Sequence, residues 1–125
     1  YSGSYNLDEI GWHAGNAKRY SWSSLGDKKE VGTKKPNELG LYDMTGNVNE
    51  WCQDKHNDDY YRHSPTTNPQ GPDRSTYKDG RCFRGGSVWE DDKYDYLKVY
   101  HRPRGGMPPE EKYGHLGLRL AMSVN

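Results

Sequence analysis

The stretch "GRCFRGGSVWEDDKYDY" (80–96) joins a short strand pattern to a turn of small residues and then to a crowd of aromatic and acidic side chains. Gly85, Gly86 and Ser87 end the strand-like run, and the residues after them have the composition of an exposed loop. Such a loop is typical either of the rim of an active site or of a surface that binds another molecule. The rest of the sequence decides between these two interpretations.

Four other short runs have the pattern of strands and are bounded by Gly, Pro, Asn or Asp: "LGLYD" (39–43), "VNEWC" (48–52), "LKVYHR" (97–102) and "LGLRLA" (116–121). Leucines and a valine recur every second residue in the last two, as in half-buried strands. The best helical candidate is 6–22, which Gly11 and Gly15 weaken. The pattern predicts a mostly β chain in which loops make up more than half of the residues and carry the function.

The composition indicates one compact domain over residues 1–125, with a single modest core. The mean hydropathy of −1.28 leans toward disorder, but 4 Trp, 11 Tyr and 1 Phe are more than disordered chains carry. Basic and acidic residues balance at 18 each, so no overall charge favours nucleic acid or an anionic membrane. We expect no membrane span, since no apolar run approaches about 18 residues, and no secretory leader is visible.

Three local clusters of charged, histidine or cysteine residues are explained without a binding site. Lysines 28, 29, 34 and 35 are interpreted as a solvated turn rather than a phosphate-binding patch, and "HNDDYYRH" (56–63) as a solvated loop rather than a metal site. Cys52 and Cys82 do not form a C-x-x-C pair. Both fall in strand-like runs, so they are either two buried thiols, which is the default, or a disulfide that would contribute roughly 3 kcal/mol.

The run "GLYDMTGNVNEW" (40–51) is dense in oxygen ligands. Asp43 and Glu50 are separated by a turn that Gly46 permits, and calcium prefers carboxylates combined with backbone carbonyls. The alternative is a plain turn capped by Asp43 and Asn47.

Signatures of catalysis are absent: we find no G-x-S-x-G, P-loop, H-E-x-x-H or G-x-G-x-x-G motif. The acids of residues 90–95 lie on a loop expected to be exposed, whereas a carboxylic general acid needs burial. Tyrosine and tryptophan interleaved with acids over residues 89–113 favour a binding surface, because these side chains give large contact areas at a low entropic cost. Half-buried aromatics of a sheet are the alternative.

Over residues 31–121 the sequence carries five motifs in this order: "GLYDMTGNVNEW", "NPQGP", "RCFRGGSVW", "YLKVYHR" and "HLGLRLA". Together, these motifs resemble those of the formylglycine-generating enzyme (sulfatase-modifying factor) family. The resemblance implies an α+β, C-type-lectin-like fold that is rich in loops with small antiparallel sheets, of which this chain is a minimal or C-terminal version. It also implies a structural calcium ion on Asp43, Glu50 and the carbonyls of Gly46 and Val48. One departure is Asn49, where the family usually has Trp.

The resemblance also bears on catalysis. The family's enzymes hold copper with two cysteines, at the third and eighth positions after the serine of the G-G-S turn. Here those positions are Glu90 and Asp95, or Asp91 and Tyr96 if Val88 is an insertion. Carboxylate oxygens do not replace two thiolates on copper(I), so no copper is expected. The related sulfoxide synthases use a histidine-bound iron from an additional domain, which this sequence lacks.

A non-catalytic branch fits better: the variable proteins of diversity-generating retroelements resemble this family and share the "RGGS…W…R…LGLRLA" pattern. In that branch, mutagenesis at adenines rewrites Asn-type codons of the C-terminal loops. The chain has 7 Asn in its first 68 residues and then none before Asn125. We therefore predict a cell-surface, secreted or virion-displayed protein that binds a protein or glycan, with no nucleic-acid partner. A divergent metal-dependent oxidase or oxygenase and a structural accessory domain are the alternatives.

The predicted ligand-binding residues are Trp89, Glu90, Asp91, Asp92, Tyr94, Asp95, Tyr96, Tyr100, His101, Arg104, Tyr113 and His115. The acids predict a preference for a basic patch on the partner, with an on-rate that falls as salt rises. Arg102 and Arg119 are predicted to be internal hydrogen-bond donors.

Overall fold

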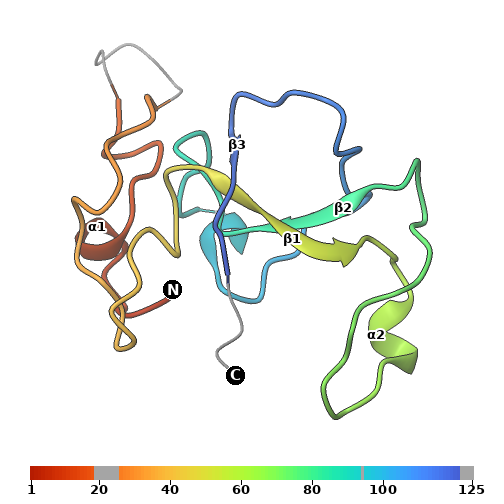
Figure 1. The fold of residues 1–125 in the computed structure, drawn as a ribbon. Coiled ribbons are helices and arrows are strands. Elements are labelled where there is room, and N and C mark those ends of the chain that lie inside the picture. The colour runs from red at the N-terminus through yellow and green to blue at the C-terminus, as the bar shows by residue number, and fades with distance from the viewer. Residues whose placement is uncertain (19–25, 94, 122–125) are drawn as a thin grey trace.

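In the computed structural model, which describes residues 1–18, 26–93 and 95–121, short elements are joined by long loops (Figure 1). The elements are α1 (Leu7–Ile10), β1 (Asn49–Lys55), α2 (Tyr60–His63), β2 (Arg81–Arg84), the 3₁₀ turn η1 (Asp95–Leu97) and β3 (Leu116–Gly117). The prediction of a loop-rich chain is confirmed, and the helical part of the expected α+β fold is limited to short segments.

The sheet has the strand order β2-β1-β3 (Figure 1). β1 and β2 are antiparallel, with Trp51 opposite Phe83, and the register shifts before Lys55. β3 runs parallel to β1, with Asn49 opposite Leu116. The expectation of purely antiparallel sheets is therefore wrong, since the sheet is mixed. The chain between β1 and β3, which includes β2, is long enough to bring β3 back in the same direction as β1.

Two predicted strands do not form. In 39–43, Gly40 and Asp43 have positive φ angles of 75° and 54°, which are incompatible with an extended strand. In 97–102, the His101 N–H donates to the Lys98 carbonyl and closes a turn. In the run 116–121, β3 covers two residues, and Leu118 and Leu120 are 73% and 86% exposed rather than half-buried.

The predicted helix over 6–22 is also much shorter than expected. α1 ends after one turn because Gly11 is extended, while its N–H still donates to the carbonyl of Leu7. Asn6 caps the helix by accepting a hydrogen bond from the N–H of Asp8. Residues 19–22 lie outside the described residues.

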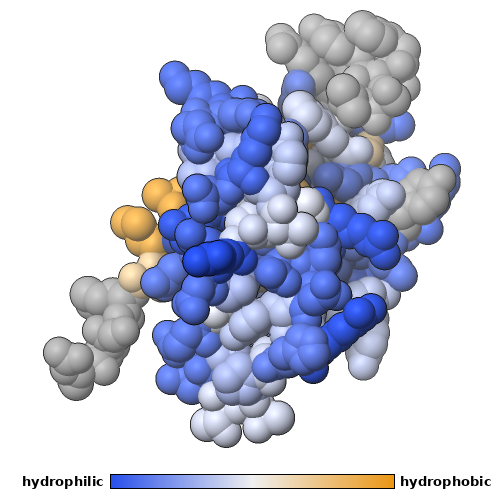
Figure 2. All heavy atoms as spheres, turned by 90° about the vertical axis from the view of Figure 1, so that its right-hand side faces the viewer, coloured by the Kyte–Doolittle hydropathy of each residue, from blue (hydrophilic) through white to orange (hydrophobic). Residues whose placement is uncertain are grey.

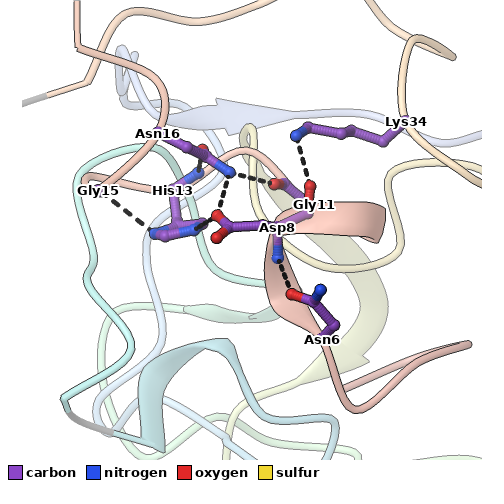
Figure 3. A network of polar contacts seen from close by, with 7 residues as sticks. All are labelled: Asn6, Asp8, Gly11, His13, Gly15, Asn16 and Lys34. Atoms are coloured by element: carbon purple, nitrogen blue, oxygen red, sulfur yellow. Dashed lines mark hydrogen bonds and ion pairs between the residues drawn. The ribbon is translucent and has the colours of Figure 1, made fainter.

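The segment around α1 is held by a polar network centred on His13 and Asp8 (Figure 3). The ring of His13 contacts Asp8 Oδ1 through Nε2 at 2.8 Å and accepts a hydrogen bond from the Gly15 N–H through Nδ1 at 3.2 Å. Asn16 donates to the same Asp8 oxygen at 2.8 Å. Hydrogen bonds from His13 and then from Asn16 lower the pKa of Asp8. Both nitrogens of His13 are therefore engaged in holding this segment together.

The lysine-rich turn packs onto this segment. Lys34 donates to the carbonyl of Asp8 at 2.6 Å and lies 3.9 Å from the centre of the Trp12 ring, and Lys35 pairs with Glu9 at 3.4 Å. These engagements favour the interpretation as a solvated turn over that as a phosphate-binding patch.

The core combines few apolar side chains with many buried polar ones. Leu7, Ile10, Ala14, Ala17, Cys82, Phe83, Val88 and Leu97 are buried together with His13, Asp43, Thr45, Asn47, Asn49, His56 and Ser87. Cys52 and Cys82 are free thiols. Burial, followed by the nearby thiol of Cys82, raises the pKa of Cys52. The default expectation of two unbridged thiols agrees with this arrangement, although Cys52 is only half-buried.

The face shown in Figure 2 is hydrophilic to intermediate over most of its area, with a hydrophobic patch at its edge. Within the described part of the chain, no helix is long and apolar enough to cross a membrane.

Candidate functional site: a pocket among the C-terminal loops

The loops between β2 and β3 close around a hollow of about 520 Å³, which we call the C-terminal pocket. It is lined by Asn49, Phe83, Glu90, Tyr96, His101, Arg102, Pro103, Arg104, Met107 and His115. Two of these residues come from the sheet, and the others come from loops. The pocket therefore has a floor fixed by β1 and β2 and walls built from residues 90–115.

Asn49 holds the base of the pocket together. Its side-chain Oδ1 accepts a hydrogen bond from the Gly86 N–H at 3.1 Å, and its own N–H donates to the carbonyl of His115 at 2.8 Å. Gly86 has a positive φ of 71°, and a Cβ there would lie 2.6 Å from the side chain of Leu97. The departure from the family's usual Trp thus has a structural role. Asparagine supplies an acceptor that tryptophan lacks, and its smaller side chain leaves space above the floor.

The G-G-S turn is closed by hydrogen bonds between Ser87 and Glu90. The N–H and Oγ of Ser87 donate to Glu90 Oε2 at 2.6 and 2.5 Å, and Ser87 Oγ accepts from the Trp89 N–H at 3.1 Å. Ser87 is completely buried. Its hydroxyl is therefore committed to the loop and is not available as a nucleophile.

The loop 101–107 is attached by three contacts to the end of the β1–β2 strand pair where β1 ends and β2 begins. His56 Nε2 lies 2.9 Å from the carbonyl of Pro103, Arg102 Nη2 donates to the carbonyl of Asn57 at 2.8 Å, and Arg81 and Met107 exchange backbone hydrogen bonds. His56 is completely buried. Burial, followed by the charge of Arg102, lowers its pKa, so His56 is the neutral donor to Pro103. The prediction that Arg102 is an internal donor is confirmed.

Two imidazoles line the walls. The ring of His101 makes an edge contact with Tyr96 at 5.0 Å, and that of His115 lies 4.7 Å from Trp89 and 6.0 Å from Tyr113. Burial, followed by the charge of Arg84, lowers the pKa of His101. Within the described residues, Nδ1 of His115 is buried and has no partner.

Five of the twelve predicted binding residues line this pocket: Glu90, Tyr96, His101, Arg104 and His115. Trp89 and Tyr113 contact it indirectly through the ring of His115. Asp91, Asp92, Asp95 and Tyr100 lie outside its lining, and Tyr94 lies outside the described residues. Sequence reasoning missed Asn49, Phe83, Pro103 and Met107 as lining residues and assigned Arg102 an internal role alone.

The four predicted calcium ligands, Asp43, Gly46, Val48 and Glu50, line a second hollow. Asp43 Oδ2 accepts from the Gly32 N–H at 2.7 Å, whereas Oδ1 is buried without a partner. Gly46 has a φ of 83°, and a Cβ there would lie 2.3 Å from the carbonyl oxygen of Trp12. The turn therefore keeps its glycine whether or not a metal binds.

Glu50, which was expected to be a calcium ligand, is bound to an arginine. Its two oxygens accept from Arg119, from Nη2 at 2.6 Å and from Nε at 2.7 Å, and Arg119 also donates to the carbonyl of Tyr42 at 2.8 Å. The hydrogen bonds to Glu50 raise the pKa of Arg119. The predicted role of Arg119 as an internal donor is confirmed.

The residues of this second hollow fit a calcium ion only in part: Asp43 offers an oxygen without a partner, whereas both oxygens of Glu50 are bound to Arg119, which lines the same hollow. No group of three or more His, Cys, Asp or Glu converges anywhere in the described ranges, so backbone carbonyls would complete the shell. The calcium site stays a prediction. The run 56–63 forms no such group either, although His56 is buried and not solvated.

The fold and the pocket define a class: a loop-rich, C-type-lectin-like domain with a hollow among its C-terminal loops. Residues 1–124 match the sulfatase-modifying factor enzyme 1-like domain, so the chain belongs to the FGE-sulfatase family. Its structure is similar to that of Treponema denticola variable protein 1, with a TM-score of 0.69 and 32% identity, over 94% of this chain and 38% of that one.

Relatives by sequence include two longer proteins. Formylglycine-generating enzyme of Streptomyces coelicolor is 38% identical over 73% of this chain and 28% of the enzyme. Serine/threonine-protein kinase pkn1 of Chlamydia pneumoniae is 41% identical over 79% of this chain and 15% of that protein. The chain thus spans less than a third of the length of these curated relatives.

Proposed function

We propose that this chain is a non-catalytic ligand-binding domain in which the C-terminal pocket and its rim bind a protein or glycan. One observation carries the proposal: side chains predicted to vary line the pocket, while other residues fix its shape. Tyr96, His101 and His115 belong to the first group. Asn49 and Ser87 belong to the second, because their side chains hydrogen-bond the loop backbone.

Thiol chemistry at the family's catalytic position is not supported by the residues present. Glu90, which takes the place of a cysteine, is bound to Ser87. The two cysteines lie in β1 and β2, and the raised pKa of Cys52 keeps its thiol protonated. A thiolate-held metal would need two ionised cysteines at the pocket, so we infer binding and not oxidation.

We further propose that residues 88–115 are diversified by a retroelement and that the protein is displayed outside the cell. The similarity to a variable protein of Treponema denticola supports this proposal. The neighbouring DNA tests it. A reverse-transcriptase gene beside a near-copy of the codons for 81–121 is expected, and its absence would contradict the diversification but not the binding.

The binding itself is tested by selection. The wild-type chain is panned against displayed random dodecapeptides and against immobilised glycans, and bound probes are retested on Tyr96→Ser. Tyr5→Ser is the matched control, because Tyr5 is fully exposed and does not line the pocket. We expect binders whose affinity falls at least tenfold with Tyr96→Ser and not with Tyr5→Ser. Binders indifferent to both variants, or stoichiometric oxygen consumption with bound copper or iron, would contradict the proposal.

A further inference from the structure

The C-terminal pocket carries a local excess of cationic side chains. Arg102 and Arg104 line it, and Glu90 is the one carboxylate among its described lining residues. The chain as a whole is balanced, with 18 basic and 18 acidic residues. The imidazoles of His101 and His115 add hydrogen-bonding nitrogens to the same walls. The field inside the pocket therefore favours an anionic group even though the protein is neutral overall.

Burial and the charge of Arg84 lower the pKa of His101 and outweigh the charges of Glu90 and Asp95, which reach the pocket and act to raise it. Oε2 of Glu90 accepts two hydrogen bonds from Ser87, which direct its charge toward the turn. Asp91 accepts a hydrogen bond from the Lys93 N–H and lies 3.9 Å from its ammonium group. The sequence predicted a basic partner from the acids of residues 90–95, of which Glu90 lines the pocket together with two arginines, whereas Asp91, Asp92 and Asp95 lie outside the lining.

The two arginines are arranged differently. Arg102 is fixed by its hydrogen bond to the carbonyl of Asn57 and lies 5.0 Å from the centre of the Tyr61 ring. Arg104 is exposed and has no hydrogen bond or ion pair with any described residue. Arg102 thus uses part of its guanidinium on Asn57 and Tyr61, which lie outside the pocket lining, whereas the guanidinium of Arg104 is open to a ligand. Guanidinium groups bind carboxylates through paired hydrogen bonds.

The pocket also has an apolar part. It consists of Phe83 in the floor, which is buried, and of Pro103 and Met107 in the walls beside the arginines. These three side chains offer a sugar ring no polar partner, so a glycan would have to replace its water with the polar residues of the walls alone. An apolar side chain of a peptide, by contrast, gains from burial on such a floor.

We propose that the C-terminal pocket binds an acidic segment of a protein, with a carboxylate between Arg102 and Arg104 and a neighbouring apolar side chain on Phe83 and Met107. This inference rests on the proposed function of the pocket as the ligand site and names the class of ligand.

The dodecapeptides selected on the wild-type chain test the inference. Those that need Tyr96 are expected to place Asp or Glu next to a Leu, Met or aromatic residue. Arg104→Gln should weaken them about tenfold, which corresponds to about 1.4 kcal/mol, and raising NaCl from 50 to 300 mM should weaken them further. Arg74→Gln is the matched control, since Arg74 lies on an exposed loop outside the pocket.

The outcomes separate the two proposals. Selected peptides that need Tyr96 but are neutral or basic would overturn the acidic ligand and leave the binding function standing. Glycans that need Tyr96, in the absence of such peptides, would overturn the protein partner alone. Probes that bind without any dependence on Tyr96, or no binders at all, would overturn both. Acidic peptides that keep their affinity in Arg104→Gln would overturn the proposed role of that arginine.

Discussion

Replacing Asn49 by leucine should destabilise the protein and loosen the base of the pocket. Leucine has a similar size, so the change removes chiefly the amide. The Gly86 N–H would lose the acceptor that it has at 3.1 Å and would stay buried, because Asn49 is 3% exposed and Gly86 is buried. A buried donor without a partner costs about 1–3 kcal/mol.

The expected loss is therefore about 2 kcal/mol in the free energy of unfolding. For a domain of this length, 1 kcal/mol corresponds to about 4 °C in Tm, so Tm should fall by about 8 °C. Urea titration at pH 7.5 gives the free energy, and amide hydrogen exchange of Gly86 gives the local effect. That amide should exchange faster than in the wild type even under conditions where both proteins are folded.

Gln53→Leu is the control, because Gln53 also carries an amide on β1 but is exposed. A surface change of this kind should stay within about 0.5 kcal/mol. The reasoning is refuted if Asn49→Leu and Gln53→Leu have equal stability, or if the Gly86 amide stays fully protected. Asn49→Trp, which restores the residue usual in the family, should fill the pocket and remove binding. Overpacking of this buried position would cost about 1–3 kcal/mol.

Three further predictions concern the metal, the pH response and the core. If Asp43 helps to hold calcium, Ca²⁺ at a hundredfold excess over Kd should raise the free energy of unfolding by about 2.7 kcal/mol relative to EDTA, and with it Tm. Asp43→Ala should abolish the rise, and equal Tm values in both buffers would contradict the site. Because burial lowers the pKa of His56 from its ordinary value of 6.5, its contribution to stability is complete above about pH 6.5 and is lost as the pH falls below that value. Urea titrations between pH 7.5 and 5 should show a flatter profile for His56→Gln, and identical slopes would disprove the assignment. Leu97→Ala, at a side chain 1% exposed, should cost about 3 kcal/mol, whereas Val99→Ala at its 62% exposed neighbour should cost less than about 0.5 kcal/mol in the same titration.

The sheet was predictable where two segments with a strand pattern pair with one another. "VNEWC" and "GRCFRGG" overlap β1 and β2, and Trp51 lies opposite Phe83 in an edge-on ring contact at 6.4 Å. "LGLYD" and "LKVYHR" have similar alternation but no pairing partner, and a strand without a neighbour gains little from its pattern. The parallel β3 depends on where a long loop returns the chain, which no local pattern specifies.

The site was predictable in its loops and not in its floor. Aromatic and charged residues after the G-G-S turn carried a compositional signal, and several of them line the pocket. Phe83 and Met107 have ordinary sequence contexts and reach the pocket through tertiary packing, in the latter case through backbone bonds to Arg81. The sequence showed that Asn49 departs from the family pattern, but it did not predict the hydrogen bond between Asn49 and Gly86.

The structure separates buried residues that keep the loops in place from half-exposed residues, which under the proposed function would contact the ligand. Val88 and Leu97 are each 1% exposed and bury the loop against the core, and Ser87 fixes the turn. Trp89 and Tyr96, by contrast, are 43% and 45% exposed. Replacing a half-exposed side chain leaves no deep cavity, so its cost in stability is small.

We expect a domain with this division to tolerate many different side chains around one pocket, because Asn49 and Ser87 hold the backbone of the turn by hydrogen bonds. The division also has a measurable consequence. Random substitutions at the exposed positions should alter which peptides bind while Tm stays within a few degrees, and substitutions at the buried positions should lower Tm by about 4 °C or more for each kcal/mol lost. A library in which exposed and buried positions reduced Tm equally would show that packing and recognition are not separate in this fold.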